Sequence, residues 1–519
     1  MAFATYTLQV DWNNDGDFGD AGEDVTARLL HVQWERGRDY ASALTGRSKS
    51  AKLRATLDNT SGDYSSFNTS SPLTGKIVPG RKVRLDGGTG SFPYTFPIVF
   101  NDSPHFVGYL QRIIPIGDLH GKDVAILEVW GALGQINQKR IHVELVADIG
   151  TGAAFEDILE EAGLTTTTDF KFDTGQTTIK RFWLSIVDHT IKALRQVEWV
   201  EGGFIKENKD GVIEFEDRHH RLKSPHTTSQ ATFSDASGAA RTYSKAPQQD
   251  AMVGIFNEFD ATVQTYTVAS SNTVLWTLAE SGADSPLLAP RESKRFWAVF
   301  PNPDSATDAI HVDSWAAPVA TTDYITNTVS DGSGTDHTAD TAVSDVEEGP
   351  NIRERIVTNN ASVSVYLTLL QVRGKVVTRN DPVRLRATDT DSQTAYGKRN
   401  FTLQSQLMPD TAEGQSWADY HLSIYKDPIP IVEIWVNANR DHTHLVEALS
   451  RDISDRITLV ATNDAGLGIN EDFFIEAEKH VINSDRVHWV RWRLSPASGY
   501  SNFWILNTSA LGTETVLAY

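Results

Sequence analysis

An acidic segment near the N-terminus carries residues that could bind a metal ion. The segment DWNNDGDFGDAGE places oxygen ligands at alternate positions, and Gly16 allows a sharp turn, which is how a loop surrounds Ca²⁺. The candidate ligands are Asp11, Asn13, Asp15, Asp17 and Glu23. The helix-flanked calcium loop has a glutamate at its twelfth position, whereas this chain has Gly22 there and Glu23 one residue later. The alternative is a turn rich in Asp and Asn whose carboxylates face water.

Other carboxylates could support catalysis, but the sequence contains no recognised catalytic motif. There is no G-x-S-x-G, no P-loop, no H-E-x-x-H and no G-x-G-x-x-G opening a helix. The pairs Glu156/Glu160 and Glu476/Glu478 could be the two carboxyls of a glycosidase. The simpler interpretation places each pair on the solvated face of a helix or strand. We therefore expect a protein that is not an enzyme, with Ca²⁺ as its only candidate cofactor.

Two groups of histidines could ligate a transition metal or transfer protons. They are His219 with His220, and Asp441 with His442 and His444. Neighbouring histidines in a strand point to opposite faces, and His442 and His444 would lie together only if that short segment were extended. We expect surface histidines.

Aromatic residues gather near the C-terminus and could form a core or a subunit interface. They are Trp489, Trp492, Phe503, Trp504 and Tyr519. Basic residues on the predicted strands could meet an acidic partner, and the expected interface set is Lys82, Arg84, Arg456, Arg491 and Trp492.

Composition narrows the classes of protein to consider. The chain has 519 residues, 40% of them hydrophobic, and no cysteine, so we expect several domains without disulfides or thiolate metal sites. The net charge of −21 makes sequence-specific nucleic-acid binding improbable. No segment approaches the roughly 20 apolar residues of a membrane helix, and no secretion signal is recognisable, so stable membrane insertion is not expected.

The elements that must position these residues are predicted from hydrophobic periodicity. Alternating apolar residues recur at 5–12, 31–35, 51–57, 81–85 and 124–130, which predicts a β-barrel domain over 1–149. In the α+β domain 150–245, helices are expected from Thr151, as the capping residue, to Gly163 and from Ser185 to Glu198. A hairpin follows, with Asp210 and Gly211 at its turn.

The second half of the chain is predicted to be β-rich with some helices. Residues 246–375 lack helical periodicity and are expected to form an inserted β-sandwich, with 331–340 as an exposed loop. The region 376–519 should complete the α+β domain and add a second β-barrel domain. Its expected elements are helices 411–425 and 443–450 and strands 431–437, 453–461, 473–482 and 487–496. The fold class is therefore mainly β with α+β parts, in several domains.

Several segments, taken in order, resemble the tail hub or minor tail proteins of long-tailed bacteriophages, a baseplate hub-like family. The most specific stretch is RGRDY followed by LDNTSGDYSSFNTSSPLTGKIVPGRKVRL. The resemblance continues through HFVGYLQRI, VEGGFIKENKDGVIEFEDRHHR, SQTAYGKRNF, RDISDRITL, FFIEAEKHVI, WRLSPAS and FWILNTSALGTETVLAY.

The resemblance implies a structural virion protein at the distal tail tip, assembled in the host cytoplasm. It implies a homotrimer in which two small β-barrel hub domains per chain give six barrels, so that a threefold tip adapts to a sixfold tail ring and lines the DNA channel. The implied partners are the distal tail protein or tail tube ring, the tape measure protein, and receptor-binding or tail fibre proteins. The alternative, drawn from the acidic segment and the inserted sandwich, is a Ca²⁺-dependent glycan-binding or adhesion protein.

Overall fold

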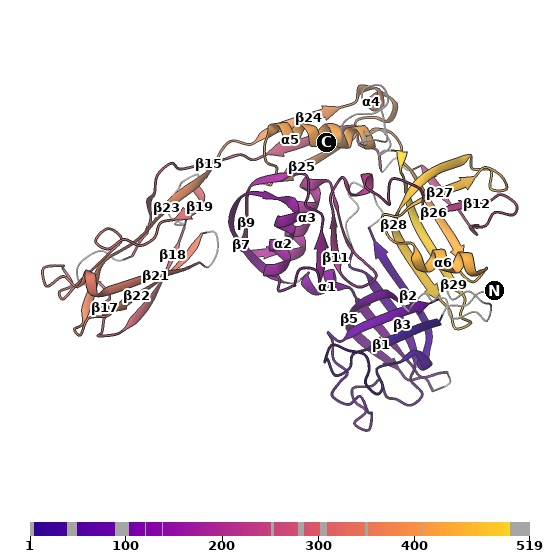
Figure 1. Cartoon of the computed structure of the whole chain (residues 1–519), viewed down its shortest axis with the longest axis horizontal. Coiled ribbons are helices and arrows are strands. Elements are labelled where there is room, and N and C mark those ends of the chain that lie inside the picture. The colour runs from indigo at the N-terminus through magenta and orange to yellow at the C-terminus, as the bar shows by residue number, and fades with distance from the viewer. Residues whose placement is uncertain are drawn as a thin grey trace.

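The protein is mainly β, with several sheets and few helices, and has four parts (Figure 1). We name them the N-terminal block (5–130), the body (132–222 with 254–263 and 383–425), the arm (266–379) and the C-terminal block (232–250 with 430–496). In Figure 1 the arm extends away from the other three parts. The computed structural model describes residues 5–38, 49–88, 103–119, 121–137, 139–250, 254–278, 285–300, 309–347, 351–405 and 407–498. The expected mainly β, multidomain fold is confirmed.

The N-terminal block is built from strands that alternate between core and solvent. Its strands are β1 (Thr5–Val10), β2 (Leu29–Gly37), β3 (Lys52–Asp58), β4 (Lys82–Gly88), β5 (Ser103–Ile116) and β6 (Val124–Trp130). In β3, for example, Leu53, Ala55 and Leu57 are buried while Lys52 and Arg54 are exposed. The apolar phase packs around Trp12 and Trp34. The alternation in the sequence predicted every one of these strands except β5, together with their buried face.

The C-terminal block repeats this arrangement and adds a helix. It contains β12 (Thr232–Ser234), β13 (Gln248–Asp250), β26 (Pro430–Asn437), α6 (His442–Ser450), β27 (Arg456–Ala461), β28 (Ile469–Ile482) and β29 (His488–Pro496). Asp441 caps α6 by accepting the backbone N–H of His444 at 2.9 Å. Trp492 and Phe233 lie in a core that is separate from that of the N-terminal block. The predicted helix and strands of this region are confirmed.

The two blocks are joined by one antiparallel strand pair, β2 with β28. The pairing runs from Val32 opposite Ile482 to Gly37 opposite Ala477. It makes a single 12-stranded sheet whose main path is β1-β4-β5-β6-β3-β2-β28-β29-β26-β13. Strands that are far apart in the sequence therefore meet at one place, which we call the seam.

The described strand ladders run along this open path and do not close either block into a ring. In the N-terminal block β1 approaches the chain just before β2, where Val10 N–H donates to Glu23 O and Val25 N–H donates to Leu8 O, both at 2.9 Å. The two closed barrels expected from the sequence therefore remain a prediction.

The body packs helices on short strands. It contains α1 (Ala132–Ile136), β7 (Arg140–Gly150), α2 (Thr151–Glu161), β8 (Phe170–Phe172), β9 (Thr178–His189), α3 (Thr190–Glu201), β10 (Phe204–Glu207) and β11 (Ile213–Glu216). Phe155 of α2 stacks on Phe215 of β11 with ring centroids 5.2 Å apart. The predicted hairpin β10–β11 turns at Asp210 and Gly211, and Gly211 has a φ of +78°.

Two details of the body differ from the sequence prediction. The second helix begins at Thr190 rather than Ser185, because the preceding residues continue β9 and pair with β7 up to Arg140 opposite His189. Thr151 does not cap α2, whose N-cap is Gly150. The Thr151 hydroxyl instead donates to the buried carboxylate of Glu201 at 2.6 Å, so a tertiary contact replaced the local cap.

The body is completed by segments on both sides of the arm. These are β14 (Glu258–Val263), β24 (Val383–Thr388), α4 (Thr390–Tyr396), β25 (Asn400–Ser405) and α5 (Thr411–Tyr425). Strand β14 pairs with both β24 and β25, although it lies inside the range expected for the insert. Trp417 of α5 shares the core of α2 and α3. Within the described residues no helix is long and apolar enough to cross a membrane.

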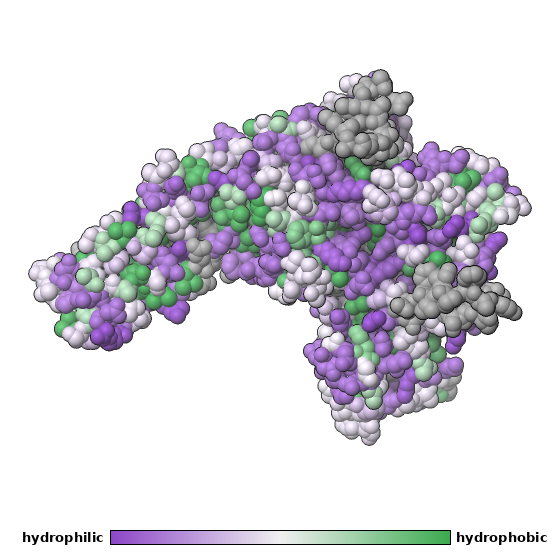
Figure 2. Space-filling model, viewed as in Figure 1, coloured by the Kyte–Doolittle hydropathy of each residue, from purple (hydrophilic) through white to green (hydrophobic). Residues whose placement is uncertain are grey.

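The arm consists of two sheets packed on a small core. Strand β23 (Val365–Arg379) is its spine and pairs with β15 (Tyr266–Val268), β16 (Thr273–Thr277), β17 (Leu287–Leu288), β19 (Ala309–Trp315) and β20 (Tyr324–Asn327). The second sheet contains β18 (Ser293–Val299), β21 (Thr341–Glu347) and β22 (Ile352–Asn359). Several hydrophobic side chains remain exposed, among them Trp297 and Val299, and Figure 2 shows hydrophobic patches along the arm.

Gly37 ends β2 at a point where only glycine fits. Its φ is +109°, and a Cβ at this position would lie 2.4 Å from the carbonyl oxygen of Glu476 and 2.6 Å from the Cα of Ala477. Those neighbours are backbone atoms of β28, so neither can move without disturbing the seam. Gly75 has a comparable φ of +76°, but nothing lies within 4 Å of a Cβ built there.

We predict that Gly37→Ala destabilises the protein by roughly 2 to 4 kcal/mol, since it adds a backbone clash to the cost of a positive φ. Gly75→Ala, which has only the φ cost, should lose about 1 kcal/mol. Urea unfolding followed by tryptophan fluorescence measures both. Equal losses for the two variants would mean that the seam tolerates a side chain at Gly37.

Candidate assembly surface at the seam

A buried ion network lies under the seam and links three parts of the protein. Arg36 of β2, with 1% of its side chain exposed, donates to Glu478 of β28 at 2.6 and 2.9 Å and to Asp452 at 2.9 Å. It also donates to the carbonyl oxygen of Glu207 in the body at 3.0 Å. Burial alone would raise the pKa of the Glu478 carboxyl, but Arg36 and His480 beside it hold that pKa well below its usual range.

The tip of hairpin β10–β11 is fixed to the N-terminal block by a carboxylate. Glu207 is 2% exposed and accepts the backbone N–H groups of Ala51 and Leu133. Burial raises its pKa to about 7, although both N–H groups and Arg36 favour the charged form. This carboxyl satisfies two backbone donors that would otherwise be buried without partners.

A second buried pair ties the body to the C-terminal block. Arg221 donates to both oxygens of Glu476, at 2.5 and 3.0 Å, and Ser495 donates to the same carboxylate at 2.6 Å. Burial alone would raise the pKa of Glu476, but Arg221 and Arg38 lower it to about 2. With these contacts the N-terminal block, the body and the C-terminal block are all joined at the seam.

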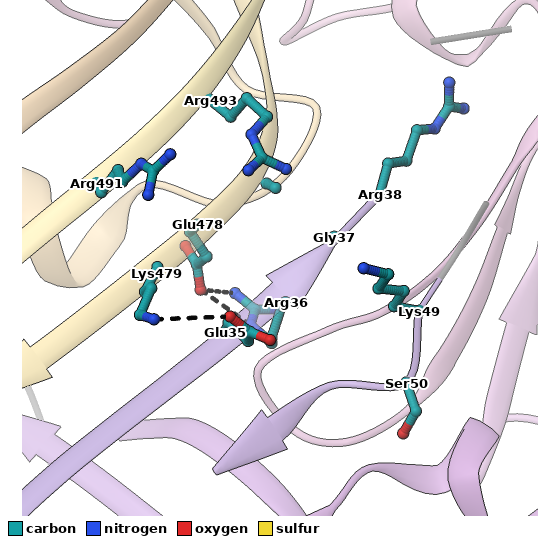
Figure 3. Close-up of a pocket in the computed structure, with 11 residues that line it drawn as sticks. Glu35, Arg36, Gly37, Arg38, Lys49, Ser50, Glu478, Lys479, Arg491 and Arg493 are labelled. Carbon is teal, nitrogen blue, oxygen red and sulfur yellow. Dashed lines mark hydrogen bonds and ion pairs between the residues drawn. The ribbon is translucent and has the colours of Figure 1, made fainter. Parts of the chain in front are cut away.

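Above the network the seam opens as a groove of about 200 Å³ (Figure 3). Basic side chains dominate its lining: Arg36, Arg38, Lys49, Lys479, Arg491 and Arg493, against the acidic Glu35 and Glu478. In Figure 3, Arg491 and Arg493 project from the C-terminal block, and Arg38 and Lys49 line the opposite side. Glu433 accepts from both Arg491, at 2.7 Å, and Arg493, at 3.2 Å.

A single row of side chains crosses the seam on the exposed face of the sheet. Strand register places these residues side by side in the order Trp130, Lys52, Glu35, Lys479, Arg491 and Trp435. Lys52 lies 5.7 Å from the ring centroid of Trp130, and Arg491 lies 5.6 Å from that of Trp435. In both blocks, therefore, the second strand from the seam carries a cation and the third carries a tryptophan. We call these residues the seam row.

The interface residues expected from the sequence divide into two groups. Arg491 lies in the seam row, whereas Trp492 is fully buried in the core of the C-terminal block and offers no surface to a partner. Naming Trp492 was wrong, because alternation in β29 turns it away from Arg491. Arg84 and Arg456 lie outside the seam row and each pairs with an aspartate, Asp86 at 2.7 Å and Asp472 at 2.8 Å. Lys82 is half-buried at the start of β4.

The acidic segment folds as a loop organised by Asp11. The Asp11 carboxylate is 2% exposed and accepts the backbone N–H groups of Asn14, Asp15 and Gly16. Within the described residues no three acidic or histidine side chains are placed so that they could hold a metal. Asp17 accepts the backbone N–H of Gly19.

Two features of this loop nonetheless favour a cation. The amide nitrogen of Asn13 donates to both Asp15, at 2.8 Å, and Asp20, at 2.5 Å, so two carboxylates converge on one point. Glu23 is 1% exposed; one of its oxygens accepts the Asp20 N–H at 3.0 Å, while its other oxygen, Oε1, is buried without a partner.

The remaining carboxylate candidates take structural roles. Glu476 and Glu478, expected on an exposed strand face, are 7% and 2% exposed and neutralise buried arginines. The exposed-face interpretation was wrong because Phe474, Glu476, Glu478 and His480 share the buried phase of β28. Glu156 and Glu160 lie on α2, where Thr166 donates to both at 3.0 Å.

The histidine candidates also differ from expectation. His444, expected at the surface, is 1% exposed; it accepts the N–H of Thr242 at 2.9 Å and contacts Asp441 at 2.7 Å. His220 lies 2.7 Å from Asp173 and 3.3 Å from Glu216. Burial alone would lower its pKa, but these carboxylates raise it. Phe503, Trp504, Tyr519 and the terminal segment 503–519 lie outside the described residues.

Sequence reasoning missed Arg36, Glu207 and Asp452. For Arg36 a signal was present, because β2 buries Val32, Trp34 and Arg36 in the same alternating phase. A charged residue in the apolar phase of a strand predicts a buried, paired ion.

We predict that Arg36→Met costs about 3 to 5 kcal/mol of stability, because Glu478 is left as an unpaired buried charge. Adding Glu478→Gln should recover part of this loss. The matched control is Arg112→Met, which breaks a cross-strand pair with Glu128 whose arginine is 65% exposed and should cost less than about 1 kcal/mol. Chemical denaturation measures the series, and similar losses for the two arginines would contradict a structural role for the network.

No protein-family model and no curated protein matches the sequence. The fold is similar to a tail protein from Neisseria meningitidis MC58, with a TM-score of 0.50, 9% identity, and 94% of this chain and 96% of that chain covered.

Two further solved structures are similar at lower scores. The 43 kDa tail protein of prophage MuSo2 from Shewanella oneidensis gives a TM-score of 0.49 at 10% identity, covering 96% of this chain and 99% of that one. Prophage tail protein gp18 from Listeria monocytogenes EGD-e gives 0.37 at 7% identity, covering 94% of each chain. At the level of the fold, the resemblance to bacteriophage tail and baseplate-hub-like proteins is confirmed.

Proposed function

We propose that this chain is a structural component of a bacteriophage tail, a hub at the distal tip, and not an enzyme. The observation that carries the proposal is the seam row, in which both blocks present a cation and a tryptophan at matching strand positions on one continuous sheet face. The shared fold with a tail protein supports it.

The hub acts as a homotrimer that adapts threefold to sixfold symmetry. A trimer can contact a hexameric ring evenly only if each subunit offers two similar surfaces. The two halves of the seam row are such a pair, and three subunits would present six. The partners are then the distal tail protein or tail tube ring, the tape measure protein, and receptor-binding or fibre proteins around a channel for DNA.

Charge favours an acidic partner surface at this row. The row holds three cations, Lys52, Lys479 and Arg491, and one carboxylate, Glu35, in a chain whose net charge is −21. Arg491 is also paired with Glu433 beside the row. A local excess of cations on an acidic protein orients the encounter with a carboxylate-rich ring. Tryptophans at both ends of the row add apolar contact area.

The test is assembly into particles, followed by gold-labelled antibody against the arm in electron microscopy. Wild-type chain should label only the distal tail tip. Lys52→Glu in the N-terminal block and Arg491→Glu in the C-terminal block should each lower the label per particle by about tenfold, because each places like charges against the partner. Arg112→Glu, outside the row, is the matched control and should label as wild type.

Two outcomes would contradict the proposal. Bare tail tips together with label on the host surface would favour the adhesion protein instead. Loss of assembly in only one of the two row variants, with both proteins folded, would refute the pair of equivalent surfaces.

Sedimentation should also give three times the chain mass of 57.3 kDa.

We further propose that the acidic loop binds a divalent cation. Because its candidate ligands are oxygen atoms, we propose that this cation is Ca²⁺. Asp11, Asn13, Asp15, Asp17 and Glu23 are the ligand candidates. The buried oxygen of Glu23 without a partner is the supporting observation, since an uncompensated buried carboxylate oxygen is costly. Binding would draw in Asp15 and Asp20, which already converge on the amide of Asn13.

Terbium, which replaces Ca²⁺ at oxygen sites, tests this directly. Trp12 donates its indole N–H to the carbonyl oxygen of Gly22 at 3.1 Å, so excitation of tryptophan should sensitise terbium emission from the loop, and Ca²⁺ should abolish it. Glu23→Gln should weaken binding by about tenfold. Asp24→Asn, exposed beside the loop, is the control. Absence of sensitised emission from the wild type at millimolar terbium would refute the site.

A further inference from the structure

A chain of buried rings crosses the seam beside the ion network. The hydroxyl of Tyr6 on β1 lies 2.6 Å from Nδ1 of His488 on β29, and Nε2 of His488 lies 2.9 Å from Nδ1 of His480 on β28. Nε2 of His480 then lies 3.5 Å from the Glu478 carboxylate. The rings of His480 and His488 are 2% and 0% exposed. We call these four residues the relay.

The carboxylate sets the direction of the hydrogen bonds. Glu478 is held in its charged form by Arg36, so the nitrogen of His480 that faces it must carry a proton. In neutral His480 the other nitrogen, Nδ1, then accepts from His488 Nε2–H, and His488 Nδ1 accepts from the Tyr6 hydroxyl. The two hydrogen bonds, from Tyr6 to His488 and from His488 to His480, therefore run toward Glu478. The 3.5 Å contact between His480 and Glu478 is a polar contact rather than a hydrogen bond.

The relay joins the two blocks through Tyr6, while its other three residues lie in the C-terminal block. Tyr6 packs against the cores of the N-terminal and the C-terminal block. Trp34 of β2, the strand that pairs with β28, stacks on His480 with centroids 4.4 Å apart and planes at 11°. His105 of β5 lies 6.4 Å from Trp34 and contacts the carbonyl oxygen of Gly87 at 3.3 Å. Breaking the relay would therefore loosen the seam from both sides.

The charged groups around the relay come from four elements. Glu478 faces it from β28, Arg36 from β2, and Lys209 from the turn of hairpin β10–β11. His105 faces it from β5. Asp452 sits behind Arg36 at 2.9 Å. Among the described residues, Glu478 is the negative group in direct contact with the rings, and it is already neutralised by Arg36.

Burial keeps the rings of the relay uncharged at neutral pH. It lowers the pKa of His480 despite Glu478 beside it, and together with the neighbouring histidines it lowers that of His488 well below the usual range. It also lowers the pKa of His105 to about 3 and raises that of Tyr6. Each of these groups would be charged more easily in an opened seam.

We propose that the relay is an acid-operated lock on the seam, closed when both histidines are neutral and opened when they are protonated. One added proton can be carried by reversing the two hydrogen bonds that link Tyr6, His488 and His480, with the charge placed on His480 against Glu478. A second proton makes His488 cationic, so that two N–H groups face each other across 2.9 Å. The hydrogen bond between the rings, which joins β28 to β29, is then lost, and two buried cationic rings lie against Trp34 of β2. Because charged groups are costly to bury, separation of β28 from β2 becomes more favourable.

The sign of the effect follows from the direction of the shifts. The pKa values of the histidines in the closed seam lie below their unfolded value of about 6.5. Once the pH falls below about 6.5, the closed seam therefore binds fewer protons than the open seam. Stability of the seam is therefore full above about pH 6.5 and falls as the pH drops. Each proton taken up on opening favours the open seam by about tenfold per pH unit.

Hydrogen exchange on the intact chain tests the lock. After correction for intrinsic rates, amides of 32–37 in β2 and 477–482 in β28 should open between about 10-fold and 100-fold more often per unit of pH below 6.5. Amides of α2 and α3, outside the seam, should keep their protection over the same range. Near pH 5 the fluorescence of Trp34, released from His480, should change in parallel.

Variants separate the relay from general acid unfolding. His488→Gln and His480→Gln keep a polar side chain but cannot be protonated, and either should flatten the pH dependence of seam exchange. His442→Gln, an exposed histidine at the start of α6, is the control and should behave as wild type. Measurements on the wild-type chain alone can overturn the proposal. Either of two results would do so: seam protection that is unchanged down to pH 4.5, or protection that is lost from α2 and α3 together with the seam.

Discussion

The fold depends on one strand pair, β2 with β28, which buries the charged side chain of Arg36. Strand β2 can pair with β28 only if Arg36 is taken out of water, because it lies in the buried phase of β2. The cost of desolvating a guanidinium is large, and Glu478 and Asp452 offset it. Since neither carboxylate lies near Arg36 in sequence, the pairing is specified by ion geometry as well as by apolar burial. The row above it crosses the sheet through this pair, and His480 of the relay stacks on Trp34 across it.

Local signals predicted the elements well. Alternation located the strands of both blocks, and a three-to-four residue periodicity located α2 and α5 at nearly their observed ends. The errors arose where a tertiary contact overrode local preference. The segment after Ser185 carries helical spacing yet continues β9, because β7 offers a pairing partner. Thr151 has capping chemistry but donates to Glu201 instead.

The candidate site was harder to predict, because its residues lie on strands far apart in sequence. Of the expected interface residues, Arg491 lies in the seam row, but its neighbours Lys52 and Trp130 are set by register that no local pattern reveals. Trp492 was misplaced because size and aromaticity suit a core as well as an interface. The acidic residues of β28 looked solvated because charge usually indicates exposure, and only the arginines from other elements reverse that expectation.

The seam also has a consequence for how the protein folds as it is made. Arg36 and Glu478 are separated by 442 positions, so β2 leaves the ribosome long before its partner exists. Until then the N-terminal block has an unpaired edge strand with a charged group exposed in its apolar phase, and edges of this kind invite wrong pairing. The same arginine keeps this unpaired edge strand soluble and disfavours its pairing with other strands. The residue that anchors the finished sheet therefore also protects its unfinished form during synthesis.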